Sequence, residues 1–212
     1  MLPAVEPVHF SSGLLTLEGA LHRPLRASPF PGVVVCHPGP LQGGDMDNNV
    51  VMGVTEALVH KGVAVLRFNF RGVGGSQGVH DKGIGEVQDG AAALSFLSLC
   101  PGVDGSRLGV AGYSFGARIA LAVAQGSGVK ALCLIGASPR SITDTSMFQI
   151  AVPKLLISGD RDGFAPSQEL DRMFEGLTGP KEKAWVAGSD HFFGGYEEVV
   201  GRLASEFFAR EL

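Results

Sequence analysis

Residues 108–118 read Leu108-Gly109-Val110-Ala111-Gly112-Tyr113-Ser114-Phe115-Gly116-Ala117-Arg118. A short apolar run enters a Gly-x-Ser-x-Gly turn, and the residues after the turn have a helix-like pattern. A serine at the apex of a strand-to-helix turn lies in strained backbone geometry, where side chains two positions away on either side would collide. Gly112 and Gly116 provide the clearance, and the helix start offers free N–H groups to a developing oxyanion. Ser114 is therefore the candidate nucleophile.

The Gly-x-Ser-x-Gly pattern is a weak signal without its context. With 31 glycines in 212 residues, a chance match is expected in roughly one of three such chains. A second match, Gly74-Gly75-Ser76-Gln77-Gly78, has no apolar strand directly before it and no helical pattern directly after it. We interpret Ser76 as a loop serine, and the role of Ser114 depends on finding its partners.

Composition indicates one globular domain spanning residues 1–212, with 45% hydrophobic and 18% charged residues. The net charge of −4 and the absence of a basic cluster argue against nucleic acid as a partner.

The three cysteines, Cys36, Cys100 and Cys133, are odd in number and lie in or beside apolar runs, which favours buried reduced thiols over disulfides or a zinc site. Neither a leader peptide nor an apolar run of membrane-spanning length is evident, so we expect a cytoplasmic protein without a membrane partner.

The order of apolar segments predicts an α/β fold. Residues 8–10 and 14–22 flank a turn and alternate as an antiparallel hairpin does, which we expect at one edge of the sheet. Strands are then predicted at 33–36, 63–70, 108–113, 129–135, 152–158 and 185–187, and helices at 49–60, 86–99 and 115–124. This alternation predicts a mostly parallel sheet of about 7–8 strands with helices on both faces. Ligands bind such sheets beyond the carboxyl ends of the strands.

The connection between the strands that end at residue 135 and begin at residue 152 is short. About 16 residues leave room for one short helix and no cap domain. Met147, Phe148 and Ile150 lie there, and we expect such side chains to line a shallow site for the acyl group.

The loop after the first predicted central strand contains His37-Pro38-Gly39-Pro40-Leu41. Proline has no N–H, so among residues 38–40 only Gly39 can donate a backbone hydrogen bond, and a ligand can approach its bare Cα. The Gly39 N–H is the candidate for one arm of an oxyanion hole, with Leu41 second. The Gly-rich loop at 71–76 lacks the Gly-Lys-Ser/Thr of a phosphate-binding loop, which argues against nucleotide binding.

A serine hydroxyl needs a base to take its proton and an acid to orient that base. His191 follows the last predicted strand and is the candidate base. Asp160 and Asp162 follow the strand at 152–158, and we prefer Asp162 because it lies further out along the loop. Asp190 is a poor acid for its neighbour His191, since adjacent side chains diverge. Three of the remaining histidines, His9, His22 and His60, are predicted to be structural. His37 and His80 lie in loops that we expect to border the pocket, and a contact of either with substrate is an open alternative.

The chain order Ser114, Asp162, His191 is that of the α/β-hydrolase triad. The chain resembles small α/β-hydrolases, close to the dienelactone-hydrolase-like bacterial serine hydrolases, over nearly its whole length. The matching motifs are His37-Pro38-x-Pro40-x-x-Gly43-Gly44-x-Met46-x-Asn48, Arg67-Phe68-Asn69-Phe70-Arg71-Gly72-Val73-Gly74-x-Ser76, Gly112-x-Ser114-x-Gly116, Gly159-x-x-Asp162-x-x-x-Pro166 and Asp190-His191-Phe192-Phe193. The resemblance implies that the Phe115 N–H is the other oxyanion donor. Two residues depart from the usual pattern, namely Gly39 where histidine is frequent, and Ser114 where dienelactone hydrolases proper use cysteine.

The sequence thus predicts a lidless serine hydrolase of carboxylic esters with small acyl groups, using no cofactor and no metal. Its expected partner is a small-molecule ester, and the chain is expected to be a monomer or a homodimer. The same triad would also serve a thioesterase, a lactonase or an amidase. A non-catalytic binding protein with the α/β-hydrolase fold is a further alternative.

Overall fold

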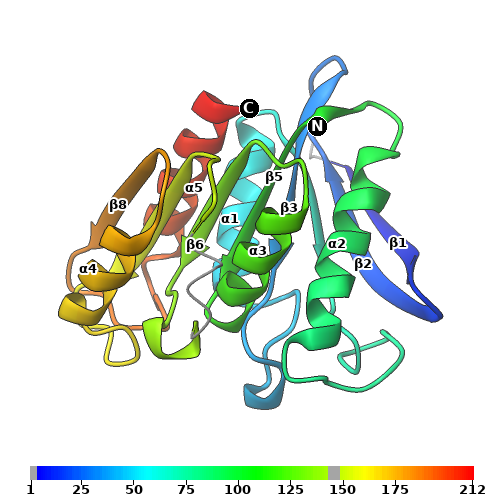
Figure 1. The fold of residues 1–212 in the computed structure, drawn as a ribbon. Coiled ribbons are helices and arrows are strands. Elements are labelled where there is room, and N and C mark those ends of the chain that lie inside the picture. Colours follow the sequence, from blue (N-terminus) through cyan, green and yellow to red (C-terminus); the bar gives the residue numbers. More distant parts are fainter. Residues whose placement is uncertain (1–3, 143–148) are drawn as a thin grey trace.

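The computed structural model describes residues 4–142 and 149–212. Within them, eight strands form one sheet in the order β1-β2-β4-β3-β5-β6-β7-β8 (Figure 1). The strands are β1 (Ala4–Ser12), β2 (Leu15–Arg23), β3 (Phe30–Cys36), β4 (Ala64–Phe68), β5 (Val103–Tyr113), β6 (Ala131–Ile135), β7 (Lys154–Gly159) and β8 (Lys181–Val186). In this order each pair of neighbouring strands from β4 onward is parallel, so the predicted α/β fold with a mostly parallel sheet is confirmed.

The N-terminal hairpin lies at one edge of the sheet, as predicted. β1 pairs antiparallel with β2, and β2 pairs antiparallel with β4. The turn between the hairpin strands consists of Gly13 and Leu14, and Gly13 has φ of +61°, which glycine adopts without strain.

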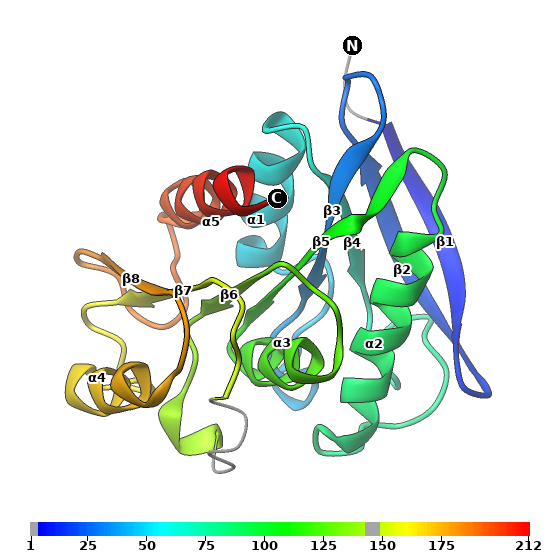
Figure 2. The ribbon, with the colours of Figure 1, turned by 45° about the horizontal axis from the view of Figure 1, so that its top comes forward.

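Helices cover both faces of the sheet (Figure 2). α1 (Asn49–His60) and α5 (Glu197–Glu211) pack together on one face. α2 (Ile84–Ser98), α3 (Phe115–Gly126) and α4 (Ser167–Gly176) lie on the other. A Cβ on Gly201 of α5 would lie 2.5 Å from the Gly53 carbonyl oxygen of α1. The close contact between these two helices therefore depends on glycine.

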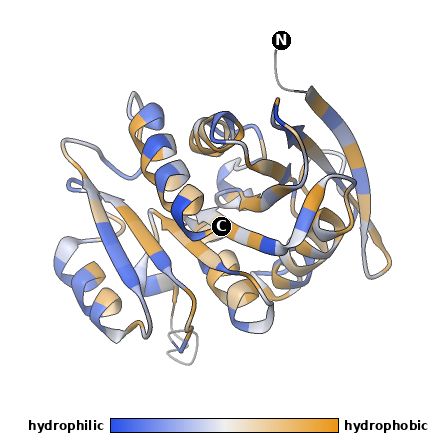
Figure 3. Cartoon of the chain, turned by 90° about the horizontal axis from the view of Figure 1, so that it is seen from above, coloured by the Kyte–Doolittle hydropathy of each residue, from blue (hydrophilic) through white to orange (hydrophobic). Residues whose placement is uncertain are grey.

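The alternation of side chains along the central strands divides the core into two layers. On β3, Val33 and Val35 pack in the layer of α1 and α5, whereas Val34 and Cys36 pack in the layer of α2 and α3. Both faces of each strand are buried, which explains the continuous apolar runs. Figure 3 shows hydrophobic residues along these strands and hydrophilic residues on the outer sides of the helices. Cys36, Cys100 and Cys133 are all buried and unpaired.

The boundaries of some elements differ from the prediction. β5 begins at Val103, five residues before the predicted strand at 108–113, and β8 spans Lys181–Val186 where only 185–187 was predicted. A short 3₁₀ helix, η2 (Pro139–Ser141), follows β6. No cap domain is inserted within the described residues, as predicted, and none of the helices described there is long and apolar enough to cross a membrane.

The prediction for the acyl site was wrong at Ile150. Ile150 is 3% exposed and packs in the core on the α2–α4 side of the sheet, because burying this aliphatic side chain among apolar neighbours is more favourable than exposing it to solvent. Met147 and Phe148 lie outside the described residues.

Candidate active site

Ser114 lies between β5 and α3 in backbone geometry that non-glycine residues rarely adopt. Its φ is 55° and its ψ is −113°, and its N–H donates to the Ile135 carbonyl at 2.8 Å. A Cβ on Gly112 would lie 2.0 Å from the Gly116 carbonyl oxygen, and a Cβ on Gly116 would lie 2.2 Å from that of Cys36. Both glycines are therefore required by close backbone contacts, which agrees with the clearance argued from the sequence.

Three side chains from distant parts of the chain meet at the carboxyl edge of the sheet. Ser114 Oγ lies 2.9 Å from His191 Nε2, and His191 Nδ1 lies 2.7 Å from Asp162 Oδ2. The other carboxylate oxygen of Asp162 accepts hydrogen bonds from the N–H groups of Phe164, at 2.8 Å, and Ala165, at 3.0 Å. The Asp162 side chain is fully buried, and these three partners fix its orientation.

The other two aspartates near the site serve their own loops. Asp160 Oδ1 accepts a hydrogen bond from the Gly188 N–H at 2.8 Å, and Asp190 Oδ1 accepts one from the Phe192 N–H at 2.9 Å. Among the described residues, the structure therefore brings Asp162, and neither Asp160 nor Asp190, to the imidazole.

Tyr113 contacts His191, and the sequence did not predict this contact. Its hydroxyl donates to the His191 carbonyl oxygen at 2.9 Å, and its ring centroid lies 5.7 Å from that of the imidazole. Burial, reinforced by the carboxylates of Asp162 and Asp190, raises the pKa of Tyr113 well above its usual value. The hydroxyl thus stays protonated and keeps donating. A polar residue at the end of an apolar strand, directly before the serine, was the available signal.

Phe115 and Gly39 supply the two backbone N–H groups that were predicted to form the oxyanion hole. Phe115 is the first residue of α3, so its N–H has no acceptor within the helix. Gly39 precedes the 3₁₀ helix η1 (Pro40–Gln42), and a Cβ on Gly39 would lie 3.9 Å from the Phe115 Cβ. The Gly39 carbonyl accepts from the N–H groups of Gln42 and Gly44, whereas none of the described residues accepts from its N–H. Leu41, the second candidate, has an exposed side chain.

His37 is structural, although its loop borders the site. Its Nδ1 lies 2.7 Å from the Pro38 carbonyl oxygen, and its Nε2 accepts a hydrogen bond from the Phe70 N–H at 3.1 Å. These partners place the single ring proton on Nδ1. Burial, which outweighs the hydrogen bond to Pro38 and nearby carboxylates, lowers the pKa of His37 to about 4. The neutral ring ties the loop after β3 to the chain after β4.

His37 should make the protein less stable as the pH falls from about 6.5 to about 4. In this range the unfolded chain binds a proton at residue 37 and the folded protein does not, so the free energy of unfolding decreases, levelling off below pH 4. The contribution of this ring is about 3 kcal/mol. Urea unfolding at several pH values should show a weaker pH dependence for His37→Gln than for the wild type. His60→Gln, at an exposed position of α1, is the control, and parallel curves for wild type and His37→Gln would contradict the prediction.

His80 and Ser76 also lie in ordered loops. His80 Nδ1 is 2.8 Å from the buried Glu86 carboxylate, and its ring lies 5.5 Å from the Phe115 ring. His80 thus borders the residue after the candidate nucleophile. Ser76 Oγ donates to the Asn69 carbonyl at 2.6 Å and accepts from the Glu18 N–H at 3.1 Å. Ser76 is a structural loop serine, as predicted.

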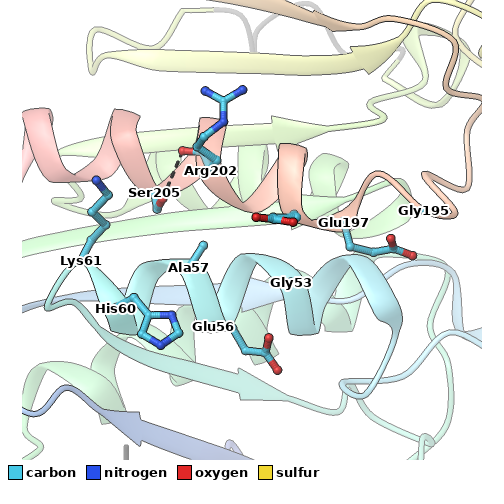
Figure 4. Close-up of a pocket in the computed structure, with 10 residues that line it drawn as sticks. Gly53, Glu56, Ala57, His60, Lys61, Gly195, Glu197, Arg202 and Ser205 are labelled. Atoms are coloured by element: carbon cyan, nitrogen blue, oxygen red, sulfur yellow. Dashed lines mark hydrogen bonds between the residues drawn. The ribbon is translucent and has the colours of Figure 1, made fainter.

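A pocket of about 700 Å³ lies elsewhere, between α1 and α5 (Figure 4). Its lining carries both signs of charge, from Glu56, Glu197 and Glu198 and from Lys61 and Arg202. None of the three converging side chains lines it, so the chemistry of Ser114 belongs to the carboxyl edge of the sheet and not to this pocket.

Residues 33–200 match the family model described as an alpha/beta hydrolase domain. The chain is 35% identical, over 84% of its length and 78% of the relative's, to an uncharacterized protein from Rickettsia prowazekii. It is similar to the structure of an alpha-beta serine hydrolase homologue from Coxiella burnetii, at 32% identity, a TM-score of 0.86, and 95% and 96% coverage of the two chains. A serine hydrolase without a lid from Xanthomonas campestris is similar at 29% identity, a TM-score of 0.80, and 98% and 94% coverage.

Proposed function

Since the chain belongs to the alpha/beta hydrolase family, we propose that it is a serine hydrolase of carboxylic esters with small acyl groups. The observation that carries the proposal is the relay in which a strained serine, an imidazole and a buried carboxylate lie within 2.9 Å and 2.7 Å of one another. The three buried thiols support the cytoplasm as its location.

The geometry supports a two-step reaction through an acyl-enzyme. Ser114 Oγ attacks the ester carbonyl while His191 Nε2 takes its proton, and Asp162 stabilises the imidazolium that forms. The N–H groups of Phe115 and Gly39 hold the oxyanion. The imidazolium then donates its proton to the departing alkoxide, and the carbon–oxygen bond of the ester breaks. Water, activated by the same imidazole, hydrolyses the acyl-enzyme and restores Ser114.

Gly39→Pro tests the oxyanion role against Gly39→Ala. The φ of Gly39 is −51°, which proline and alanine both adopt, and in both variants the new Cβ displaces only the flexible end of Gln42. Alanine keeps the N–H and proline removes it. We expect kcat for an ester to be lower by about 10²- to 10³-fold in Gly39→Pro than in Gly39→Ala. Equal kcat values would remove Gly39 from the oxyanion hole and leave Leu41 as the candidate.

A fluorophosphonate probe tests the proposed function directly. An activated serine reacts covalently with the probe, whereas a binding protein with the same fold does not. We expect one label per chain, located on Ser114 by peptide mass spectrometry. p-Nitrophenyl esters of increasing acyl length should then show the highest kcat/KM for the shortest acyl groups. An unlabelled folded protein would overturn the proposed function.

A further inference from the structure

Two exposed aromatic side chains flank the imidazole of His191. Phe164 and Phe192 are 57% and 60% exposed, and they are the only exposed phenylalanines among the described residues. Their ring centroids lie 4.7 Å and 5.8 Å from that of His191. The two rings contact each other edge to face at 6.3 Å, so they form one apolar surface beside the base. Exposed aromatic rings that adjoin a polar site are typical of ligand recognition.

The proposed reaction determines which part of an ester meets this surface. In the tetrahedral intermediate the reacting carbon bears the Ser114 oxygen, the oxyanion, the acyl chain and the alkoxy oxygen. The oxyanion faces the N–H groups of Phe115 and Gly39. The alkoxy oxygen must lie about 3 Å from His191 Nε2 to receive its proton. The alcohol part of the ester therefore lies beside the imidazole, where the rings of Phe164 and Phe192 are.

We infer that Phe164 and Phe192 select esters of apolar, preferentially aromatic, alcohols. This inference rests on the proposed function and deepens it. The two side chains contact the alcohol while the first carbon–oxygen bond breaks, and the alcohol has left before water attacks. Their effect therefore falls on acylation, which kcat/KM reports, and not on hydrolysis of the acyl-enzyme.

Benzyl acetate and methyl phenylacetate test this inference because they are isomers. The first carries its phenyl ring on the alcohol side, and the second carries it on the acyl side. Phe164→Ala and Phe192→Ala should each lower the ratio of kcat/KM for benzyl acetate to that for methyl phenylacetate by about threefold to tenfold, and the double variant by about thirtyfold. Leucine at both positions should restore part of the ratio. Leu99→Ala should leave this ratio unchanged. Leu99 is exposed and apolar, and it lies between α2 and β5, where the strand begins and away from the carboxyl ends of the strands.

The outcomes separate recognition from support of the imidazole. Equal losses of kcat/KM for the two isomers would leave the ratio unchanged and mean that the rings only position His191. Wild-type kcat/KM values for both isomers would mean that the rings do not contact the alcohol. Either result overturns the inference. A wild-type protein that reacts with fluorophosphonate yet hydrolyses neither isomer overturns it as well. Absence of the fluorophosphonate reaction itself overturns the proposed function instead.

Discussion

Ser114→Ala should lower kcat for ester hydrolysis by about 10⁵- to 10⁶-fold and abolish labelling by fluorophosphonate. The reason is that alanine lacks the hydroxyl oxygen that lies 2.9 Å from His191 Nε2 and attacks the carbonyl in the proposed reaction. Folding should be preserved, because alanine and serine meet the same strain at φ of 55°. The measurement is steady-state turnover of a short-chain p-nitrophenyl ester, together with the melting temperature.

Ser76→Ala is the matched control because Ser76 lies in the second Gly-x-Ser-x-Gly match. Ser76 is buried and its hydroxyl makes two hydrogen bonds, so the loss of this hydroxyl should lower the free energy of unfolding by about 1–3 kcal/mol and leave kcat near the wild-type value. Ser114→Ala should thus lose activity and keep its stability, whereas Ser76→Ala should lose stability and keep its activity. Ester hydrolysis that survives in Ser114→Ala would show that another group is the nucleophile.

The parts of the site that the sequence predicts share one physical origin. In a parallel sheet the carboxyl ends of the strands meet at one edge, so polar residues in the loops that follow the strands come together. Ser114, Asp162 and His191 follow β5, β7 and β8 in this way, and the structure places them in contact. The role of the glycines at 112 and 116 could also be predicted, because only a residue without a side chain permits the observed backbone contacts.

Other features depend on contacts that no local pattern contains. The first residues of β5 include an Asp-Gly pair, which is typical of turns, yet Val103 pairs with Phe30 of β3. Ile150 has an aliphatic side chain of the kind expected to line the acyl site, but it lies in the core. The exposure of Phe164 and Phe192 could not be predicted from the sequence either, because whether an aromatic side chain in a loop packs inward depends on residues far along the chain.

Asp162→Asn should lower kcat by about 10⁴-fold and leave the fold intact. The N–H groups of Phe164 and Ala165 both donate to one oxygen of this side chain, and an asparagine can accept them only with its carbonyl oxygen. Its NH₂ group must then face His191 Nδ1 and donate to it. The imidazole is forced to carry its proton on Nε2, where it cannot take the proton of Ser114.

Asp160→Asn supplies the comparison, since it removes a charge at the same strand end. Asp160 accepts only the Gly188 N–H in the described contacts, and an asparagine carbonyl accepts that bond equally well. Its kcat should stay within about threefold of the wild-type value, since it has no contact with the imidazole. A larger loss of kcat in Asp160→Asn than in Asp162→Asn would transfer the role of the orienting acid to Asp160. Two isosteric changes two residues apart thus isolate the hydrogen bond to His191 Nδ1 from the general effect of negative charge at this edge of the sheet.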